Sequence, residues 1–154
     1  MEKKLLSQNE IDSYNKNGYL AVTNVLNAAE LETLRHVTDA YVEQSRQIRE
    51  NDEIFDLEPG HTPDSPKLRR IKKPANVHPV YKKTMSHPVI LDIIAQLIGP
   101  DICAIGHKLN MKSGGFGSQV EWHQDWAFFP HTNNNVLAIG LCLDDMTEAN
   151  GCLM

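Results

Sequence analysis

The sequence lacks long apolar runs, paired cysteines and an overall excess of positive charge. No apolar stretch approaches the roughly 20 residues that a transmembrane helix needs, and the start Met-Glu-Lys-Lys leads into a polar segment rather than a signal-peptide core. The formal net charge of -5 argues against a broad nucleic-acid surface, because phosphate binding needs clustered positive charge. We therefore expect a cytoplasmic protein that binds neither membranes nor nucleic acid.

The three cysteines, Cys103, Cys142 and Cys152, are odd in number and have no CxxC spacing. Such a set is typical neither of a disulfide framework nor of a zinc ribbon. Their apolar neighbours instead predict reduced thiols in the core. With 154 residues, 41% of them hydrophobic, the chain is long enough for a core, and we expect residues 1–154 to form a single domain.

Positive charge is concentrated in one stretch that contains no acidic residue. It comprises Lys67, Arg69, Arg70, Lys72, Lys73, Lys82 and Lys83. A run of this kind forms either a solvated basic face or an anion-binding site, and composition alone leaves both open.

Capping signals predict three helices in the first hundred residues. Ser7 with Glu10, and Asn27 with Glu30, fit the capping box, and Pro88 stands at the favoured first position of a third helix. Gly18 should end the first helix, with a short strand over residues 19–22 after it. The predicted buried stripes are Leu31, Leu34, Val37, Tyr41, Val42, Ser45 and Ile48 on the second helix, and Leu91, Ile94, Leu97 and Ile98 on the third.

Between these helices, residues 51–67 are rich in Asp, Glu, Pro and Gly and predict a loop. After Pro100 the apolar period changes to two: Ile105, His107, Leu109 and Met111 alternate with Gly106, Lys108, Asn110 and Lys112. This alternation predicts one strand with two distinct faces. A nearly continuous apolar run over residues 136–143 predicts another strand. Helices first and strands later favour an α+β fold with a β-sandwich or barrel core.

The segment Trp122-His123-Gln124-Asp125-Trp126 holds the most informative side chains. In an extended chain His123 and Asp125 project to the same side and can supply two of the three ligands of a 2-His-1-carboxylate iron site. About 0.5 His-x-Asp occurrences are expected by chance in this composition, so the spacing alone decides nothing. Its context favours a site: a glycine-rich turn over residues 113–119 precedes it, and aromatic residues flank it.

The chain resembles the phytanoyl-CoA dioxygenase family, which includes ectoine hydroxylase. The resemblance runs from Leu6 through Gly18-Tyr19-Leu20, Ile98-Gly99-Pro100, Trp122-His123-Gln124-Asp125 and Asn150-Gly151-Cys152-Leu153. It implies a double-stranded β-helix, a jelly-roll relative, with helices packed outside. It also implies Fe(II) bound by His123 and Asp125, 2-oxoglutarate as cosubstrate, and hydroxylation of a small-molecule substrate by dioxygen.

The resemblance further implies cosubstrate contacts by Lys108, Asn110 and Lys112, by Lys72 in the basic stretch, and at Leu141, where some relatives have a tryptophan. For the strand residues, an ordinary solvent-facing side is the alternative. The keto acid needs a cation or polar clamp for its distal carboxylate. Substrate identity and oligomeric state have no signal in the sequence.

A second histidine ligand and a keto-acid arginine are implied beyond the Asn-Gly-Cys-Leu segment, where the sequence stops at Met154. We therefore expect a fragment, a truncated product or an incompletely traced chain that binds iron weakly. Two other hypotheses stay open: a non-catalytic binding module on a jelly-roll shell, and a cupin-like metalloenzyme of other chemistry.

Overall fold

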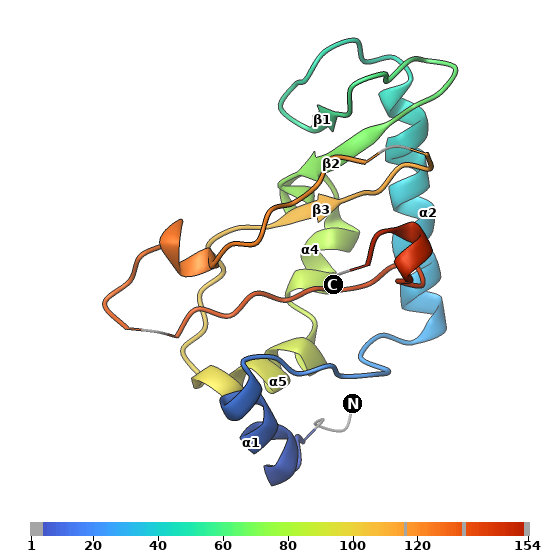
Figure 1. The fold of residues 1–154 in the computed structure, drawn as a ribbon. Coiled ribbons are helices and arrows are strands. Elements are labelled where there is room, and N and C mark those ends of the chain that lie inside the picture. Colours follow the sequence, from blue (N-terminus) through green and yellow to red (C-terminus); the bar gives the residue numbers. More distant parts are fainter. Residues whose placement is uncertain (1–4, 116, 134, 153–154) are drawn as a thin grey trace.

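The computed structural model describes residues 5–115, 117–133 and 135–152 and combines helices with a small sheet (Figure 1). Phe116 of the predicted glycine-rich turn and Leu153 of the Asn-Gly-Cys-Leu segment lie outside the described residues. In chain order the elements are α1 (Gln8–Asn17), α2 (Ala28–Ser45), β1 (Phe55–Leu57), β2 (Leu68–Lys72), α3 (Pro74–Val77), α4 (Pro79–Met85), α5 (Pro88–Ile98), β3 (Lys108–Asn110), and the 3-10 turns η1 (Asp125–Ala127) and η2 (Glu148–Asn150). The α+β class predicted from the sequence is confirmed.

Both predicted capping boxes are present. The Ser7 amide donates to the Glu10 carboxylate over 2.7 Å, and the Glu30 amide donates to the Asn27 side chain over 2.9 Å. Gly18 ends α1 with a φ of 80°, a left-handed conformation that costs glycine little. The strand predicted over residues 19–22 is wrong, because this segment packs Leu20 and Val22 on the α1–α5 core instead of joining a sheet.

The sheet has the order β1-β2-β3, with both pairs antiparallel. The first part of the basic stretch forms the central strand, β2, which was not predicted because its charged residues hid the strand pattern. Strand β1 lies inside residues 51–67, which were predicted to form a loop. Both strands form because each carries core residues: Phe55 is 1% exposed and Ile71 is 0% exposed. Burial of these two side chains outweighs the turn-like composition around them.

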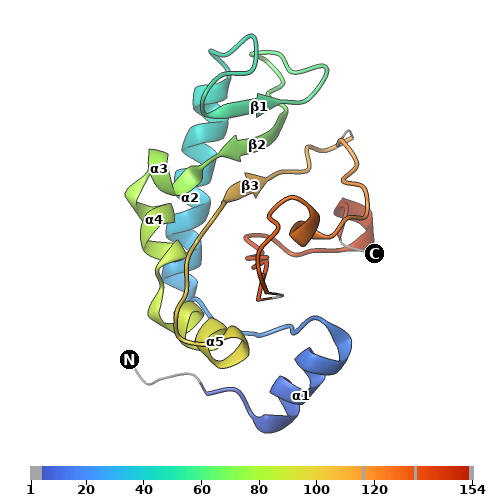
Figure 2. The same cartoon turned by 90° about the vertical axis from the view of Figure 1, so that its left-hand side faces the viewer.

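Helix α2 covers one face of the sheet, and the chain after β3 lies beyond the other face (Figure 2). The covered face contains Phe55, Leu68 and Ile71, on which Tyr41, Val42, Leu109 and Met111 pack. Leu109 and Met111 thus lie on the apolar side of the strand predicted from residues 105–112. The alternation is confirmed over residues 107–112 but not at Ile105, which is 50% exposed, and only the middle of the segment pairs with β2.

Helix α5 begins at Pro88 as predicted, but its buried stripe was wrong in part. The buried residues are Val89, Ile90, Ile93 and Ile94. Because this helix is apolar around most of its circumference, the contact with α1 selects the buried side, and periodicity cannot. The short proline-initiated helices α3 and α4 were not predicted.

Residues 136–143 form no strand ladder among the described residues, so the strand predicted there is wrong. No layer covers this segment, and Ile139 is 53% exposed. Cys103 and Cys142 are exposed and Cys152 is half-buried, which corrects the prediction of core thiols, although none of these three described residues forms a disulfide. No helix in the described ranges is long and apolar enough to span a membrane.

Candidate metal site

His123 and Asp125 converge at the start of η1. Gln124 between them has an extended backbone, with φ -109° and ψ 125°, so its two neighbours project to one side. His123 Nε2 lies 3.4 Å from Asp125 Oδ1. Both side chains are about one-third exposed, at 36% and 38%, so a ligand can reach them from solvent.

The other imidazole nitrogen is held by the backbone. His123 Nδ1 lies 2.7 Å from the Glu121 carbonyl oxygen, which can only accept, so Nδ1 is the protonated nitrogen. In the neutral ring the lone pair is therefore on Nε2, beside the carboxylate. Metal-binding histidines are typically oriented by such a hydrogen bond. Phe128 packs edge-on against this imidazole with a centroid separation of 5.6 Å and limits its rotation.

This donor pair fits a first-row divalent metal ion. Nitrogen and oxygen ligands lie about 2.0–2.2 Å from such ions, so two adjacent ligands are roughly 2.8–3.1 Å apart in an octahedral site and roughly 3.3–3.6 Å apart in a tetrahedral one. The observed 3.4 Å lies within the tetrahedral range and slightly above the octahedral one. Within the described ranges no group of three His, Cys, Asp or Glu side chains could hold a metal, so the pair is an incomplete ligand set.

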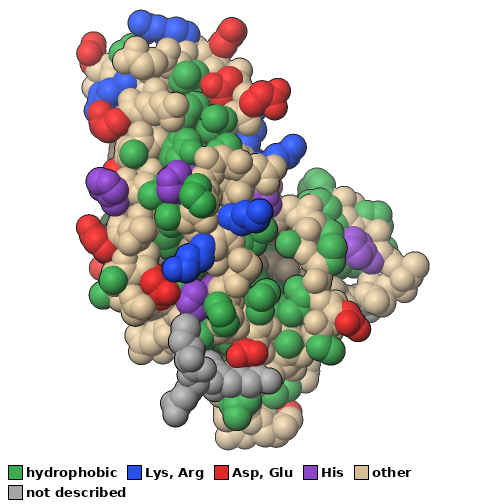
Figure 3. Space-filling model, turned by 180° about the vertical axis from the view of Figure 1, so that it is seen from behind, with side chains coloured by type: hydrophobic (Ala, Val, Ile, Leu, Met, Phe, Trp, Pro, Cys, Tyr) green, Lys and Arg blue, Asp and Glu red, His purple; other side chains and the backbone are tan. Residues whose placement is uncertain are grey.

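Aromatic side chains surround the pair and are strongly exposed. Trp122 is 83% exposed and Phe128 67% exposed, on a segment that stands away from the helices (orange in Figure 1). Seen from behind, hydrophobic side chains gather on this protruding part of the surface (Figure 3). The Phe129 ring lies near the segment before β3, since a Cβ added at Gly106 would lie 3.8 Å from it. The aromatic segment therefore approaches the chain that leads into β3.

The uncovered face of the sheet is polar and carries most of the predicted cosubstrate residues. Lys72 pairs with Lys108 across the β2–β3 ladder, and Arg70 pairs with Asn110. Arg70 is neutralised by Asp56, with Nε 3.1 Å from Oδ2. Neither Lys72 nor Lys108 forms an ion pair with another described residue. Two like charges directly opposite each other repel, so an anion bound between them would relieve the repulsion.

Lys112 lies apart from that pair, directly before the glycine-rich turn, and contacts the turn through its side chain. Its Nζ donates to the Ser118 carbonyl over 2.5 Å. Its aliphatic stem passes between Gly117 and Gly151, where an added Cβ would lie 3.2 Å and 3.4 Å from it. Larger residues at either glycine would push the stem aside. Lys112 therefore joins the turn to the Asn-Gly-Cys-Leu segment in this structure.

Glu58 is a buried carboxylate beside the glycine-rich turn, and sequence reasoning missed it. It follows β1 and is 3% exposed, and its carboxylate accepts from the Ser118 amide over 2.8 Å and from the Ser118 hydroxyl over 2.5 Å. Burial opposes ionisation, but both Ser118 hydrogen bonds and the nearby Arg69 and Lys112 charges hold the pKa of Glu58 below its usual value. No local pattern could reveal a partner 60 residues away.

Leu141 lies outside this group, on the segment after the turn, and is 37% exposed. That segment is attached to α2 by Arg35, whose Nε donates to the Leu143 carbonyl over 2.7 Å and lies 3.5 Å from Asp144. The structure therefore pairs Lys72 with Lys108 and His123 with Asp125, whereas Leu141 lies in the segment that Arg35 attaches to α2.

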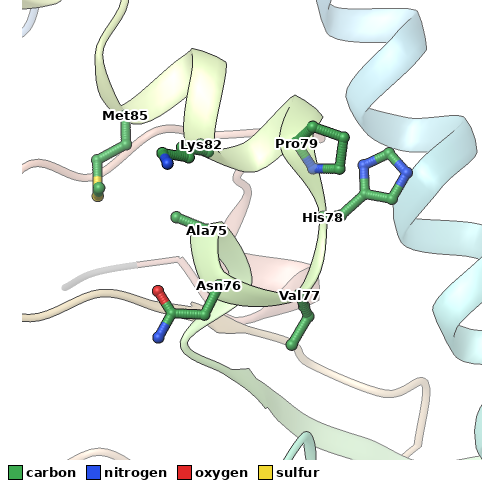
Figure 4. A pocket seen from close by; sticks show the side chains of 7 residues that line it. All are labelled: Ala75, Asn76, Val77, His78, Pro79, Lys82 and Met85. Atoms are coloured by element: carbon green, nitrogen blue, oxygen red, sulfur yellow. The ribbon is translucent and has the colours of Figure 1, made fainter.

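A surface pocket lies elsewhere, between α3 and α4 (Figure 4). The side chains of Asn76, Lys82 and Met85 border it, and none of the predicted site residues does so. His78 also lines it, and its ring extends toward α2, where it lies edge-on to Tyr41 at 6.3 Å. The pocket is open and shallow, and it has no connection to the His123–Asp125 pair among its lining residues.

Comparison with known proteins identifies related sequences. The family model described as phytanoyl-CoA dioxygenase matches residues 14–154. A probable alpha-ketoglutarate-dependent hypophosphite dioxygenase from Stutzerimonas stutzeri is 27% identical over 140 residues, which are 91% of this chain and 49% of that protein.

Two further relatives are named for hydroxylation of other small molecules. Ectoine dioxygenase from Bordetella parapertussis is 25% identical over 97% of this chain and 48% of its own length. L-proline trans-4-hydroxylase from Streptomyces griseoviridis is 26% identical over 91% of this chain and 50% of its own length. The chain thus spans about half the length of these curated relatives.

Proposed function

Because this chain belongs to the phytanoyl-CoA dioxygenase family, we propose that it contributes His123 and Asp125 to the Fe(II) site of a 2-oxoglutarate-dependent dioxygenase. The observation that carries the proposal is the 3.4 Å separation of His123 Nε2 and Asp125 Oδ1. The hydrogen bond from Nδ1 to the Glu121 carbonyl supports it, because it leaves Nε2 free to coordinate.

Each residue has a distinct part in this proposal. Bound iron supplies oxygen activation coupled to oxidation of 2-oxoglutarate to succinate and carbon dioxide, with one oxygen atom passing to a small-molecule substrate. His123 gives a neutral nitrogen donor and Asp125 a charged oxygen donor, a combination typical of facial-triad iron sites. The third ligand lies outside the described residues. Trp122 and Phe128 provide apolar surface that can exclude water near the substrate.

The cosubstrate is a dicarboxylate, and the polar face of the sheet supplies positive charge for it. We assign Lys72 and Lys108 to one of its carboxylates, because they are paired across the ladder and have no acidic partner among the described residues. Asn110, beside Lys108 on the same face, can donate a further hydrogen bond. Lys112 acts through the turn, and Leu141 would have to move to reach the cosubstrate.

The proposed architecture is the N-terminal portion of a double-stranded β-helix domain, with residues 1–154 forming one unit. The support is an open antiparallel sheet with a helix on one face and a polar opposite face. The relatives named for ectoine, proline and hypophosphite agree on small substrates and differ in their chemistry. They therefore favour a small molecule without selecting one.

Fe(II) binding tests the metal assignment. In the full-length protein under anaerobic conditions, His123→Ala and Asp125→Ala should each weaken Fe(II) binding at least about tenfold in a calorimetric titration, because one donor atom is lost. Two control variants remove the same chemical groups at exposed positions elsewhere: His36→Ala on α2 and Asp101→Ala after α5. Both should leave the Fe(II) binding isotherm unchanged. Unaltered binding in both site variants would favour a binding module instead.

The cosubstrate assignment needs a separate measurement. Lys108→Gln should weaken 2-oxoglutarate binding to the Fe(II) protein roughly tenfold, because a charge-assisted hydrogen bond is worth about 1.5–3 kcal/mol. Lys16→Gln, in the last turn of α1, is the matched control. The assignment is wrong if both variants bind the keto acid as tightly as the unmodified protein.

A further inference from the structure

The glycine-rich turn between β3 and the His123–Asp125 pair has little packing of its own. A Cβ added at Gly114 or Gly115 would meet no atom within 4 Å, and Gly115 has a φ of 72°. Open space and glycine leave a backbone with many accessible conformations. A ligand that follows such a turn is placed accurately only if another part of the molecule fixes the turn.

Ser118 is the point at which the turn is fixed. All its hydrogen-bonding groups except the hydroxyl lone pairs are engaged: its amide and hydroxyl donate to Glu58, and its carbonyl accepts from Lys112. We define these three residues as the Glu58 clasp. Ser118 precedes His123 by five residues. The connecting chain spans at most roughly 18 Å when fully extended, so a fixed Ser118 limits how far His123 can move.

Glu58 is itself held on a rigid base. Its amide donates to the Lys67 carbonyl over 2.9 Å, and its carbonyl accepts from the His61 amide over 3.1 Å. The carboxylate is 3% exposed, and burying such a group is costly unless hydrogen bonds and nearby opposite charge compensate for the lost water. The Ser118 donors and the Lys112 ammonium provide that compensation. In some proteins a buried charge of this kind specifies one geometry more than it adds stability.

We infer that Glu58 is a positioning residue for the metal site: it holds Ser118, and through the turn it sets where His123 and Asp125 converge. The inference rests on the proposed function, since it takes these two residues as metal ligands. Glu58, which follows β1, would therefore influence metal binding without itself contacting the metal.

The clasp can be tested in the full-length protein with Fe(II) alone as the probe. Glu58→Gln loses one acceptor and its charge, and Ser118→Ala loses the hydroxyl but keeps the amide. Both should weaken Fe(II) binding about tenfold, as replacement of outer-shell partners does at metal sites. Ser118→Thr retains the hydroxyl and should bind within twofold of the unmodified protein. Glu53→Gln, an exposed carboxylate near β1, is the matched control and should change nothing.

A metal-free readout separates positioning from folding. In the apoprotein, hydrogen exchange over residues 119–127 should be faster in Glu58→Gln and Ser118→Ala than in Glu53→Gln, while circular dichroism shows all three folded. If Glu58→Gln does not fold, hydrogen exchange in the Ser118→Ala variant alone tests the inference.

Three results would overturn the inference. Fe(II) affinity within twofold of the unmodified protein in the folded site variants would assign the clasp to stability alone. Unchanged exchange over residues 119–127 would show that the clasp does not hold the ligands. Failure of the unmodified protein to bind Fe(II) would remove the proposed function itself, and the inference with it.

Discussion

The helix–sheet region, residues 5–112, and the ligand region, residues 113–152, differ in how they are held. Every buried residue among those described lies in the helix–sheet region, from Leu6 to Ile94. The ligand region has no buried side chain in its described residues, and Trp126 is still 44% exposed. The first region is stabilised by apolar burial, whereas the second depends on the Glu58 clasp and Arg35. Accurate placement of the proposed metal ligands therefore rests on a few polar contacts.

The largest expected difference between the regions is the cost of truncating an isoleucine. Ile71→Ala should lower the free energy of unfolding of this chain by about 2–5 kcal/mol, since Ile71 is 0% exposed and its loss leaves a cavity beneath α2. Ile139→Ala, at 53% exposed, should cost under about 0.5 kcal/mol. Urea denaturation measures both. Equal costs would mean that the ligand region has a core of its own.

Acid should loosen the junction between the regions by a smaller amount. The pKa of Glu58 is lower in the folded protein than in the unfolded chain, so its contribution is complete above the unfolded value of about 4.5 and is lost as the pH falls through the folded value. The loss should be about 1 kcal/mol, the difference between charged and neutral hydrogen bonds. The free energy of unfolding should be measured at pH 7 and below pH 4.5. Its decrease between the two should be smaller in Glu58→Gln than in the unmodified protein. A loss identical to that of the unmodified protein would contradict this.

The smallest effect is expected from the anchor on α2. Arg35→Met removes the hydrogen bond to Leu143 and keeps most of the apolar stem, so global stability should fall by less than about 1 kcal/mol because the guanidinium is 39% exposed. Local hydrogen exchange around residues 141–146 should nevertheless rise. Arg49→Met, at an exposed position beyond α2, serves as the control. Equal exchange in the two variants would show that Arg35 does not hold the ligand region.

The local features of the fold could be predicted from the sequence, and the long-range ones could not. Capping boxes at Ser7 and Asn27, and Pro88 at the start of α5, depend on residues within four positions of one another, so the chain itself encodes them. Strand β2 was missed because its charged side chains face solvent while Leu68 and Ile71 face α2. The strand predicted over residues 136–143 needs a partner and a covering layer, which hydrophobicity alone does not supply.

The candidate site follows the same rule. The convergence of His123 and Asp125 follows from an extended Gln124 and agrees with the prediction. Their metal role, and the cosubstrate roles of Lys72, Lys108, Asn110, Lys112 and Leu141, stay predictions. The contact between Glu58 and Ser118 joins residues 60 positions apart and has no signature in either segment, because a glutamate after a strand is ordinarily a solvated residue.

The position of the last buried residue also bears on the order of folding. Because no described residue after Ile94 is buried, the buried residues described here are all encoded in the part of residues 1–154 that is synthesised first. At about 5–20 residues per second, translation of residues 95–154 takes roughly 3–12 s, far longer than helix formation and collapse. The α1–α5 contact and the packing of β1 and β2 on α2 can form in that interval. The ligand-bearing segment then emerges onto a surface that already exists, with the Glu58 carboxylate in place to receive Ser118.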